Sequence, residues 1–424
     1  MARKMKDSGI EWIGEIPEGW EVHRIKNHFL IISGSGFKPE LQGQSTGDFP
    51  VCKASDISSS GHYLHTSANY ITTNFVKSQR FSIIPKGSIL FAKIGEAMRK
   101  NNRSLCLCDC CVDNNCQGLV PKKISSEFSY YLFTCIDMTW FDNAGTIPCI
   151  NNQKLYDCRF PFPSHDEQLL IANALNLQCT KINEILSHIR SSIEKYKKLK
   201  QAVITQAVTK GVRGEREMKD SGVEWIGEIP VDWTIQRFAR VAEVKSNLVS
   251  PDNYLEYPQI SPENIEKDSG KLLLPCKTVG EVGIISGNHL FHKGQILYSK
   301  IRPKLNKVCI APFDGLCSAD MYPIETNNDT RYIMYCILSD GFLQQVSMIT
   351  ENRVKMPKIN QTELSKLLLA MPNFLAEQKE IADYLDAKCA EIDKLIAKKE
   401  QLVKELESYK KSLIYEVVTG KREV

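Results

Sequence analysis

Two long stretches without glycine or proline constrain this chain more than any other feature. The first runs from Ser164 to Lys210, the second runs from Glu377 to Thr419, and a glycine follows each of them. Glycine and proline are the residues that most often interrupt helices, so each stretch predicts one continuous helix. At 1.5 Å per residue such a helix is about 65 Å long. A helix of this length cannot be buried within one small domain and needs a partner along its own length.

Both stretches carry signals of helix ends. Ser164 and Glu167 have the spacing of a capping box, in which both side chains accept hydrogen bonds from unpaired N–H groups of the first turn. Gly211 and Gly420 stand where a residue in the left-handed conformation ends a helix. We therefore expect one helix over 164–210 and another over 377–419.

Apolar residues alternate at intervals of four and three inside each stretch. This alternation is a heptad seam, which predicts that the two helices pack against each other as a coiled coil. The first expected seam is Ile171, Leu175, Ile182, Ile185, Ile189, Tyr196, Leu199 and Val203, with Gln178 and Ser192 as polar steps. The second is Ile381, Leu385, Ile392, Leu395, Leu402, Leu406, Tyr409 and Leu413, with Lys388 and Lys399 as polar steps. The alternative is two unrelated surface helices.

The two helices belong to an internal repeat that extends through the chain. Glu167-Gln168 returns 210 residues later as Glu377-Gln378, and Met5 to Pro17 returns as Met218 to Pro230 with one change in thirteen positions. Two shorter matches keep the same order, namely Gly87 to Ile94 with Gly294 to Ile301, and Pro148 to Asn151 with Pro357 to Asn360. The chain therefore divides at the polar segment 211–217 into two half-chains. Each is a globular part followed by a long helix.

The globular parts predict a mixture of short strands and short helices. Segments 88–91 and 295–298 follow Lys-Gly turns and predict strands, as do 82–84, 282–285 and 308–310. Segments 130–136 and 332–338 predict short helices. Because strands and helices do not alternate regularly, the expected fold class is α+β. The two parts differ almost everywhere outside the repeated segments, as expected of one protein that recognises two different targets.

Composition excludes several classes of protein. Of the 424 residues, 25% are charged and no apolar run approaches 18 residues, so we expect neither a disordered chain nor a transmembrane helix. The first residues lack the apolar core of a signal peptide, and the odd number of scattered cysteines is typical of a reducing compartment, so we expect a cytoplasmic protein. The net charge of +4 permits a nucleic-acid partner without requiring one.

The fifteen cysteines have no framework spacing and predict free thiols. Five of them lie within eleven residues: Cys106, Cys108, Cys110, Cys111 and Cys116. Cys108 and Cys111 have C-x-x-C spacing, but no second pair of ligands follows, so buried thiols are favoured over the alternative of a zinc site.

The repeated segments resemble those of the specificity subunits of type I restriction-modification systems. The similar elements are Lys-Asp-Ser-Gly-(Ile/Val)-Glu-Trp-Ile-Gly-Glu-Ile-Pro, Lys-Gly-x-Ile-Leu-x-x-Lys-Ile, and the helix entries from Pro163 to Gln168 and from Pro372 to Gln378. The resemblance covers essentially the whole chain. It implies an α+β protein with two α/β target recognition domains, 1–163 and 218–372, separated by two long antiparallel helices within 164–217 and 373–424 and related by a pseudo-two-fold repeat.

The resemblance also implies a function. Each recognition domain would read one half of a bipartite site in double-stranded DNA, and the helices would act as a spacer and as a docking surface for two methyltransferase subunits. Motor-nuclease subunits would join this complex. The chain itself would be non-catalytic and hold no cofactor or metal, while the partner subunits would bind S-adenosylmethionine, ATP and Mg. Half-sites read from one face of DNA recur about every 34 Å, which a two-part protein can match.

Two groups of cations follow the repeated strands and are the candidate DNA contacts. Lys300, Arg302 and Lys304 are spaced two apart, so in an extended segment they would share one face and meet phosphates or base edges. The full set of candidates is Lys93, Arg99, Lys100, Arg103, Lys300, Arg302, Lys304 and Lys307. The alternative is a solvated charged loop.

Two other functions are compatible with parts of the sequence. A DNA-modifying enzyme would be expected to carry an Asn/Asp-Pro-Pro-aromatic loop for adenine methylation or a Gly-x-x-x-x-Gly-Lys-(Ser/Thr) loop for a motor, and the sequence has neither. A coiled-coil scaffold that does not bind DNA would explain the helices but not the two large, divergent globular parts. DNA recognition is therefore the favoured function.

Overall fold

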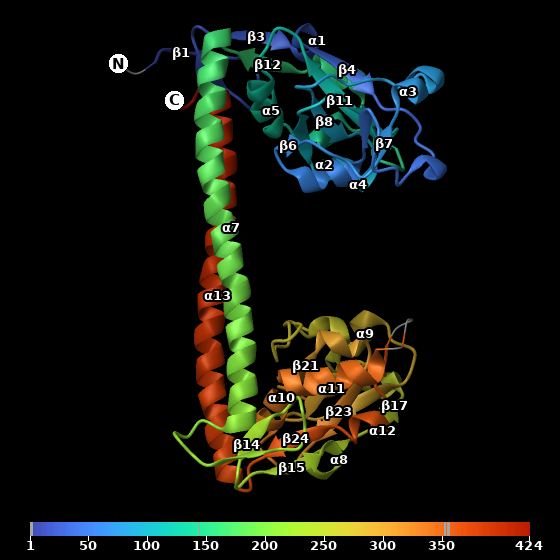
Figure 1. Cartoon of the computed structure of the whole chain (residues 1–424), viewed down its shortest axis with the longest axis vertical. Helices are drawn as coiled ribbons and strands as arrows, with labels where there is room; N and C mark the ends of the chain where they lie inside the picture. Colours follow the sequence, from blue (N-terminus) through green and yellow to red (C-terminus); the bar gives the residue numbers. More distant parts are fainter. Residues whose placement is uncertain (1–2, 144, 352, 354–356) are drawn as a thin grey trace. The chain divides into compact units, whose positions relative to one another are not determined.

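The computed structural model describes residues 3–143, 145–351, 353 and 357–424. The chain forms two compact units, one of Met1–His188 with Leu402–Val424 and one of Ile189–Gln401 (Figure 1). The division falls inside two long helices, α7 (His165–Lys210) and α13 (Leu375–Val418). Each unit therefore contains one globular domain and part of both helices. In the described part of the chain, no helix is long and apolar enough to cross a membrane.

The first globular domain is built on a five-stranded sheet with strand order β4-β11-β8-β9-β6, in which only β6 and β9 run parallel. Its strands are β4 (Phe29–Ser33), β6 (Tyr63–Leu64), β8 (Ile89–Ala92), β9 (Arg103–Cys106) and β11 (Cys116–Pro121). A three-stranded sheet and two strand pairs complete the domain, formed by β5 (Phe49–Cys52), β7 (Tyr70–Ile71) and β10 (Cys111–Val112), by β1 (Met5–Asp7) with β2 (Glu15–Pro17), and by β3 (Glu21–Arg24) with β12 (Arg159–Phe162). The helices are α1 (Ile25–His28), α2 (Ala54–Ser60), α3 (Thr73–Gln79), α4 (Gly95–Arg99), α5 (Ser126–Thr134) and α6 (Asn152–Asp157), with 3₁₀ turns η1 (Pro39–Leu41) and η2 (Met138–Phe141).

The second globular domain contains two four-stranded sheets, with strand orders β16-β23-β20-β21 and β17-β19-β22-β18. Their strands are β16 (Glu243–Val244), β17 (Leu248–Val249), β18 (Gln259–Ile260), β19 (Asn288–Phe291), β20 (Ile296–Ser299), β21 (Val308–Ile310), β22 (Gly315–Cys317) and β23 (Met321–Glu325). As in the first domain, a hairpin of β13 (Met218–Asp220) and β14 (Glu228–Pro230) and a pair of β15 (Thr234–Arg237) and β24 (Leu368–Met371) join it to the long helices. The helices are α8 (Phe238–Val241), α9 (Val279–Val282), α10 (Thr330–Leu338), α11 (Asp340–Thr350) and α12 (Gln361–Leu364), with 3₁₀ turns η3 (Pro251–Tyr254), η4 (Pro262–Asn264) and η5 (Pro303–Leu305).

The mixture of short strands and helices confirms the predicted α+β class, and β8, β20, β21, α5 and α10 confirm five of the predicted segments. Two predicted strands are wrong. Segment 82–84 makes only an isolated bridge from Ile84 to Cys110, because Pro85 follows and has no N–H to continue a ladder. Segment 282–285 begins with Val282, the last residue of α9, because Thr278 and Glu281 form a capping box that starts a helical turn at Val279.

The ends of the long helices differ from the prediction in one contact. The Ser164 hydroxyl accepts from the Glu167 N–H at 3.4 Å, as expected. The Glu167 carboxylate does not complete the capping box but accepts from the indole N–H of Trp20 at 3.0 Å. Gly211 and Gly420 have φ of +76° and +74°, which confirms both as left-handed residues that end a helix.

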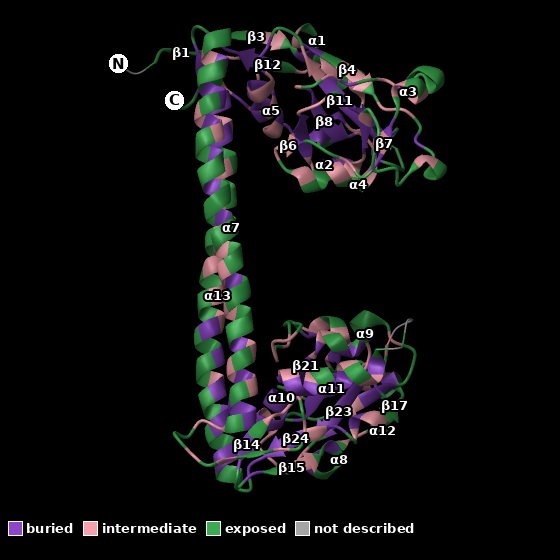
Figure 2. Ribbon diagram, viewed as in Figure 1, coloured by how far each residue is buried: buried purple, intermediate pink, exposed green. Residues whose placement is uncertain are grey.

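The two long helices pack against each other in antiparallel fashion within each unit. In the second unit Lys200 Nζ donates to the Asp393 carboxylate at 2.9 and 3.0 Å, and Lys399 Nζ lies 5.6 Å from the ring centroid of Tyr196. Residue numbers thus rise along one helix as they fall along the other. In the first unit Lys410 Nζ donates to Asn183 Oδ1 at 2.8 Å, which is the same contact displaced by 210 residues. Figure 2 shows the buried residues along both helices.

At every second position of the seam, the buried residue is the one after the residue that we predicted. Predicted seam residues that are buried or half-buried are Ile171, Leu175, Ile182, Ile189, Tyr196, Val203, Ile381, Leu385, Ile392, Leu406 and Leu413. The prediction is wrong for five apolar residues, which are exposed: Ile185, Leu199, Leu395, Leu402 and Tyr409. In their place, and in place of the polar steps Gln178, Ser192 and Lys388, the next residue along the helix is buried or half-buried: Cys179, Leu186, Ile193, Lys200, Cys389, Ile396, Val403 and Lys410.

The wrong register has a physical cause. From Leu175 onward, the intervals between buried positions are four residues and then three, whereas the predicted seam has three and then four. Both registers place apolar residues in the seam, for example Ile185 in the predicted one and Leu186 in the observed one. Lys200 and Lys410 occupy true seam positions, which hides the register from a count of apolar residues. A lysine tolerates such a position because its aliphatic stem packs in the seam while its amine finds a partner.

The corrected seam predicts different costs for two neighbouring substitutions on α7. Ile193 is 6% exposed and Leu199 is 49% exposed. Ile193→Ala leaves a cavity between the helices and should lower the free energy of unfolding by about 2–4 kcal/mol. Leu199→Ala removes a solvated side chain and should cost less than about 1 kcal/mol. Denaturant unfolding of both variants checks the register, and a larger loss for Leu199→Ala would restore the original seam.

Candidate nucleic-acid interface

In both domains a repeated strand ends in a lysine whose backbone holds the next repeated segment in place. The carbonyl of Lys93, after β8, accepts from the Ile150 N–H at 3.0 Å. The carbonyl of Lys300, after β20, accepts from the Ile359 N–H at 3.0 Å. The same hydrogen bond therefore fixes the start of the following loop in each domain, although the loops themselves have different sequences.

This loop begins with a residue in the left-handed conformation. It is Gly95, with φ of +71°, in the first domain and Arg302, with φ of +45°, in the second. Glycine adopts this conformation freely, whereas a residue with a side chain is strained there by about 1–3 kcal/mol. The N–H of Arg302 donates to the carbonyl of Pro357 at 2.8 Å, which holds the residue in this conformation. The second domain thus keeps an exposed arginine at a position where glycine would be relaxed.

The three cations of the second domain do not share one face of a strand, so the predicted extended segment is wrong. β20 ends at Ser299, and Pro303 starts the 3₁₀ turn η5 directly after the left-handed Arg302. Lys300 is half-buried, with Nζ 5.2 Å from the ring centroid of Tyr322. Arg302 and Lys304 are exposed, one at each side of the buried Pro303.

Lys307, the last candidate of this group, is held by the protein itself. Its Nζ donates to the carbonyl of Pro262 at 2.6 Å, and the side chain is half-buried. The exposed cations of this loop are therefore Arg302 and Lys304, and Lys300 and Lys307 flank them.

The first domain exposes two of its four predicted cations. Arg99 and Lys100 lie at the end of α4 and are exposed, with Arg99 paired to Glu96 at 2.7 Å. Lys93 is half-buried. Arg103 is 5% exposed, and its guanidinium donates to the carbonyl of Ile136 at 2.9 Å.

The burial of Arg103 contradicts its prediction as a DNA contact. The residue lies on β9, between β8 and β6 of the central sheet, so its side chain is enclosed by the domain. Burial lowers the pKa of Arg103 to about 10. The spacing of cations in the sequence cannot reveal this, because it does not show which face of β9 is covered.

A groove beside Lys100 is a feature that sequence reasoning missed. It has a volume of about 190 Å³ and lies between α2 and α4, where Ser55, Ser58 and Asn102 line it together with Lys100. The Asn102 side-chain amide donates to the Ser58 hydroxyl at 2.9 Å. Asparagine amides and hydroxyl groups are typical readers of base edges. No pattern in the sequence separates these small polar residues from ordinary loop residues.

Four of the five clustered cysteines of the first domain are packed as small apolar side chains, whereas Cys108 is half-buried. Cys106, Cys110 and Cys116 are fully buried in one hydrophobic cluster with Cys52. Burial raises the pKa of Cys111 to about 11, so the thiol stays protonated. In the described ranges of the chain, no group of three or more His, Cys, Asp or Glu side chains is arranged to hold a metal ion.

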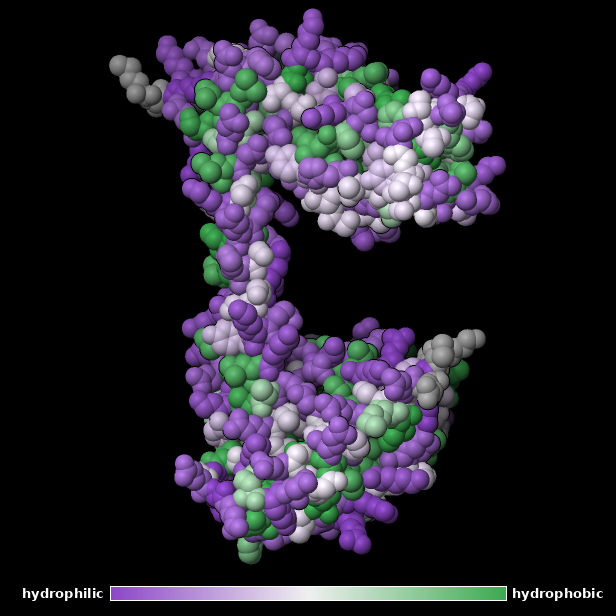
Figure 3. All heavy atoms as spheres, viewed as in Figure 1, coloured by the Kyte–Doolittle hydropathy of each residue, from purple (hydrophilic) through white to green (hydrophobic). Residues whose placement is uncertain are grey.

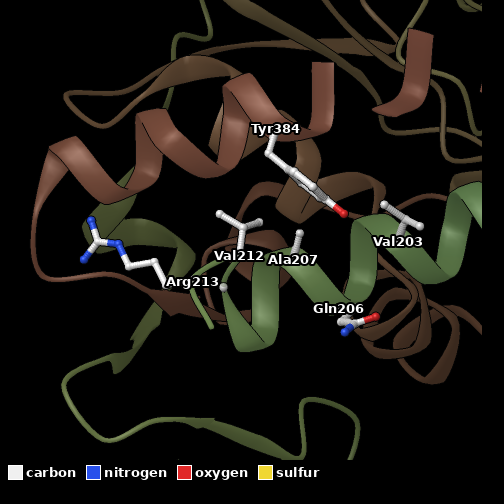
Figure 4. Close-up of a pocket in the computed structure, with 7 residues that line it drawn as sticks. Val203, Gln206, Ala207, Val212, Arg213 and Tyr384 are labelled. Carbon is white, nitrogen blue, oxygen red and sulfur yellow. The ribbon is translucent and has the colours of Figure 1, made fainter. Parts of the chain in front are cut away.

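A groove in the second unit lies where α7 ends against the start of α13 (Figure 4). Its volume is about 200 Å³, and the side chains of Val203, Gln206 and Tyr384 are among its lining. Arg213, at its rim, pairs with Glu380 at 2.7 Å. The lining residues that the structure describes include no carboxylate, thiol or imidazole, so the groove offers a packing surface rather than a reactive centre.

Comparison with known proteins shows that the same family model matches both half-chains. The family model described as "Type I restriction modification DNA specificity domain" matches this chain twice, over residues 17–195 and 230–405. The chain is 35% identical over 278 residues to the type I restriction enzyme EcoDI specificity subunit of Escherichia coli, an alignment that spans only 62% of each chain. It is 22% identical over 380 residues to the type I restriction enzyme MjaIX specificity subunit of Methanocaldococcus jannaschii, which covers 85% of this chain and 84% of that one.

The fold agrees with this comparison. A chain in a solved structure concerned with complex assembly and conformational transition of the type I R-M system superposes with a TM-score of 0.68 at 14% identity, over 96% of this chain and 99% of that chain. The doubled family match covers both globular domains and most of both long helices. The chain therefore belongs to the family of type I restriction modification DNA specificity domains, and it carries that domain twice.

Proposed function

We propose that this chain is the DNA-recognition subunit of a type I restriction-modification complex and that each of its domains reads one half of a bipartite site. The doubled specificity domain is the observation that carries the proposal. The repeated hydrogen bonds at Lys93 and Lys300 give both domains the same frame, while the loops that leave this frame differ. Two tethered readers also raise each other's effective concentration on a site with two parts.

The exposed cations beside this frame are the proposed DNA contacts. Lys100 and Lys304 carry compact ammonium groups, which suit phosphate oxygens. Arg302 carries the planar fork that can donate two hydrogen bonds to a guanine edge in the major groove. Its strained backbone supports this role, because strain of this kind is retained mainly where function requires it. Lys93, Arg99, Lys300 and Lys307 would contribute to the surrounding positive potential.

The long helices would serve as a spacer and as the docking surface for methyltransferase subunits. Neither helix contains glycine or proline, so the pair is stiff, whereas a flexible linker could not fix a distance. The face seen in Figure 3 is mostly hydrophilic and carries separate hydrophobic spots along the helices. Exposed apolar residues on α7 of the first unit include Leu170, Leu177 and Ile185, which a partner subunit could cover.

The chemistry of the complex would reside on partner subunits. Two methyltransferase subunits would bind S-adenosylmethionine, and motor-nuclease subunits would bind ATP and Mg, all in the cytoplasm. Purified chain should therefore transfer no methyl groups to DNA by itself and should direct a methyltransferase partner to a defined site. Methyl transfer by the chain alone would favour the alternative of a DNA-modifying enzyme.

Exchange of one domain tests the proposal that each domain reads its own half-site. Residues 18–163 would be replaced by the corresponding domain of another specificity subunit, with the hairpin and the helices kept. The methylated sequence should change in one half and stay the same in the other, because the two domains have separate hydrophobic cores. Replacement of 231–372 is the reciprocal control. A change in both halves after either exchange would contradict independent reading.

Substitutions at Arg302 separate base reading from phosphate contact. Arg302→Lys keeps the charge but loses the fork, so it should cost about 1–3 kcal/mol on the cognate sequence and relax one position of the half-site. Arg302→Gly relieves the backbone strain and should keep or raise the stability of the domain while losing the same affinity. Salt titration of DNA binding with the methyltransferase partner present, and thermal unfolding, are the two measurements.

Replacement of Lys304 tests phosphate contact, and its matched control is Lys267→Ala, which removes one exposed charge elsewhere on the same domain. Lys304→Ala should reduce the salt dependence of log K by about one unit for every sequence, as expected for one lost phosphate contact. Wild-type affinity and salt dependence in both Arg302 and Lys304 variants would show that this loop is only solvated.

A further inference from the structure

Each recognition domain docks on one long helix through a surface whose apolar part is the same in both units. In the first unit α5 packs on α7, and in the second unit α10 packs on α13. The apolar residues presented by the helices are Ile171, Ala172, Leu175 and Cys179 on α7 and Ile381, Ala382, Leu385 and Cys389 on α13. Because the four positions carry identical residue types, this apolar contact alone would accept either domain.

Part of the polar contact is also shared. Gln168 Oε1 accepts from the N–H of Ser125, the N-cap of α5, at 3.0 Å. Gln378 Oε1 accepts from the N–H of Asp329, the N-cap of α10, at 3.1 Å. These bonds place the first turn of the docking helix in the same way in both units, and they do not distinguish one domain from the other.

The domains differ two residues after these N-caps, where α5 carries a glutamate and α10 an arginine. Glu127 Oε2 accepts from the Asn176 side-chain amide at 3.4 Å and lies 3.2 Å from Nε2 of His62. Arg331 pairs with Asp383 at 2.7 Å and with Asp386 at 2.6 Å. The docking helices thus have opposite charge at the same position.

The long helices differ in the complementary way. Asn173 and Asn176 of α7 stand 210 residues before Asp383 and Asp386 of α13. The uncharged Asn176 therefore faces Glu127, and a pair of carboxylates faces Arg331. In both units a tyrosine of the docking helix donates a hydrogen bond to the second residue of the pair. Tyr131 donates to Asn176 at 2.6 Å, and Tyr335 donates to Asp386 at 2.7 Å.

We infer that these charged positions assign each recognition domain to its own long helix, so that the two domains cannot exchange places in the chain. On α13, Glu127 would face two carboxylates at a half-buried site, with His62 and Tyr63 as its partners from its own domain. On α7, Arg331 would lose Asp383 and Asp386 and keep Asp329 of its own domain, which lies 3.4 Å away. The order in which the two half-sites are read would then be built into the chain, and this consequence rests on the proposed function, whereas the docking itself does not.

The electrostatic environment of both groups supports this assignment. Partial burial alone would lower the pKa of Arg331, but the hydrogen bonds to Asp383 and Asp386 raise it overall. Burial alone would raise the pKa of Glu127, but hydrogen bonds from His62 and Asn176 lower it overall. Each charge is therefore stabilised by the helix on which it now lies or by its own domain.

Charge reversal with rescue in the second unit tests the inference on the full chain. Arg331→Glu should lower the thermal midpoint by several degrees and speed hydrogen exchange of the α10 amides, because a fourth carboxylate joins Asp329, Asp383 and Asp386. Adding Asp383→Asn and Asp386→Asn gives α13 the uncharged pair found on α7 and should restore most of the loss, although Asp329 still stands where the first unit has Ser125. Arg331→Gln is the matched control that removes the ion pairs without repulsion.

The rescue shows whether docking requires complementary charges on the domain and the helix or only the arginine side chain itself. If the triple variant unfolds as easily as Arg331→Glu alone, or if Arg331→Gln is as harmful as Arg331→Glu, the inference is overturned. Both outcomes are read from folding and do not depend on DNA.

Transplantation extends the test to function. Residues 231–372 would be replaced by a second copy of 18–163, once with the natural α13 and once with Asp383→Asn and Asp386→Asn. The copy should dock, and the methylated site should show the first half-site at both ends, only in the substituted chain. Equal docking on the natural α13 would refute the inference that charge assigns each domain to its helix. Docking on the substituted α13 alone, with no change in the methylated site, would support that inference and refute the proposed reading of half-sites.

Discussion

A glutamate at the start of each long helix, half-buried in the first unit and buried in the second, is the contact on which the rest of the structure depends. Glu377 is 2% exposed and accepts from the indole N–H of Trp233 at 3.2 Å, with Arg216 paired to the same carboxylate. Glu167 accepts from Trp20 and Arg3 in the same way. A carboxylate shielded from water is stable only with such partners, so the tryptophan that follows each hairpin must close on the helix start.

The glutamine that follows each glutamate ties the recognition domain to the same point. Gln168 donates to the carbonyl of Pro163 at 3.0 Å, and Gln378 donates to that of Pro372 at 3.4 Å, while both accept from the docking helix. Two adjacent side chains thus connect the hairpin, the last strand of the domain and the docking helix to the long helix. This explains why the Glu-Gln pair and the tryptophan segment recur in the sequence while the loops between them diverge.

Much of this architecture was predictable from residues, and the rest was hidden for physical reasons. The absence of glycine and proline gave the long helices nearly to the residue, since Gly211 and Gly420 do end them. The seam register was missed, because Lys200 and Lys410 occupy interior positions that look polar in a sequence. Among the candidate contacts, the spacing of cations in the sequence did not show that the Arg103 side chain is buried in its domain. It also did not show that the Arg302 backbone adopts the left-handed conformation. Both depend on the sheet and on hydrogen bonds from residues far away in the chain.

The contacts that assign domains to helices were equally invisible, although the sequence contains them. Asn173 and Asn176 match Asp383 and Asp386 at the repeat distance, but nothing in the sequence shows that Asn176 contacts Glu127 or that both aspartates contact Arg331. A repeat is therefore most informative where it is broken. Identical positions mark the common frame, and positions that change charge together mark what makes each half-chain different.

The central claim, that the helix pair fixes the distance between two independently read half-sites, can be measured through the spacing of methylation. Asn183 faces Lys410, so insertions after Ser187 and after Glu405 enter the seam opposite each other. Three added heptads in both helices keep the seam in phase and lengthen the pair by about 32 Å, close to one turn of DNA. In complex with the methyltransferase partner, the spacer between methylated half-sites should grow by about nine base pairs. The same insertion at the exposed Gly214, outside both helices, should leave it unchanged. An unchanged spacer in the chain with lengthened helices would contradict the account.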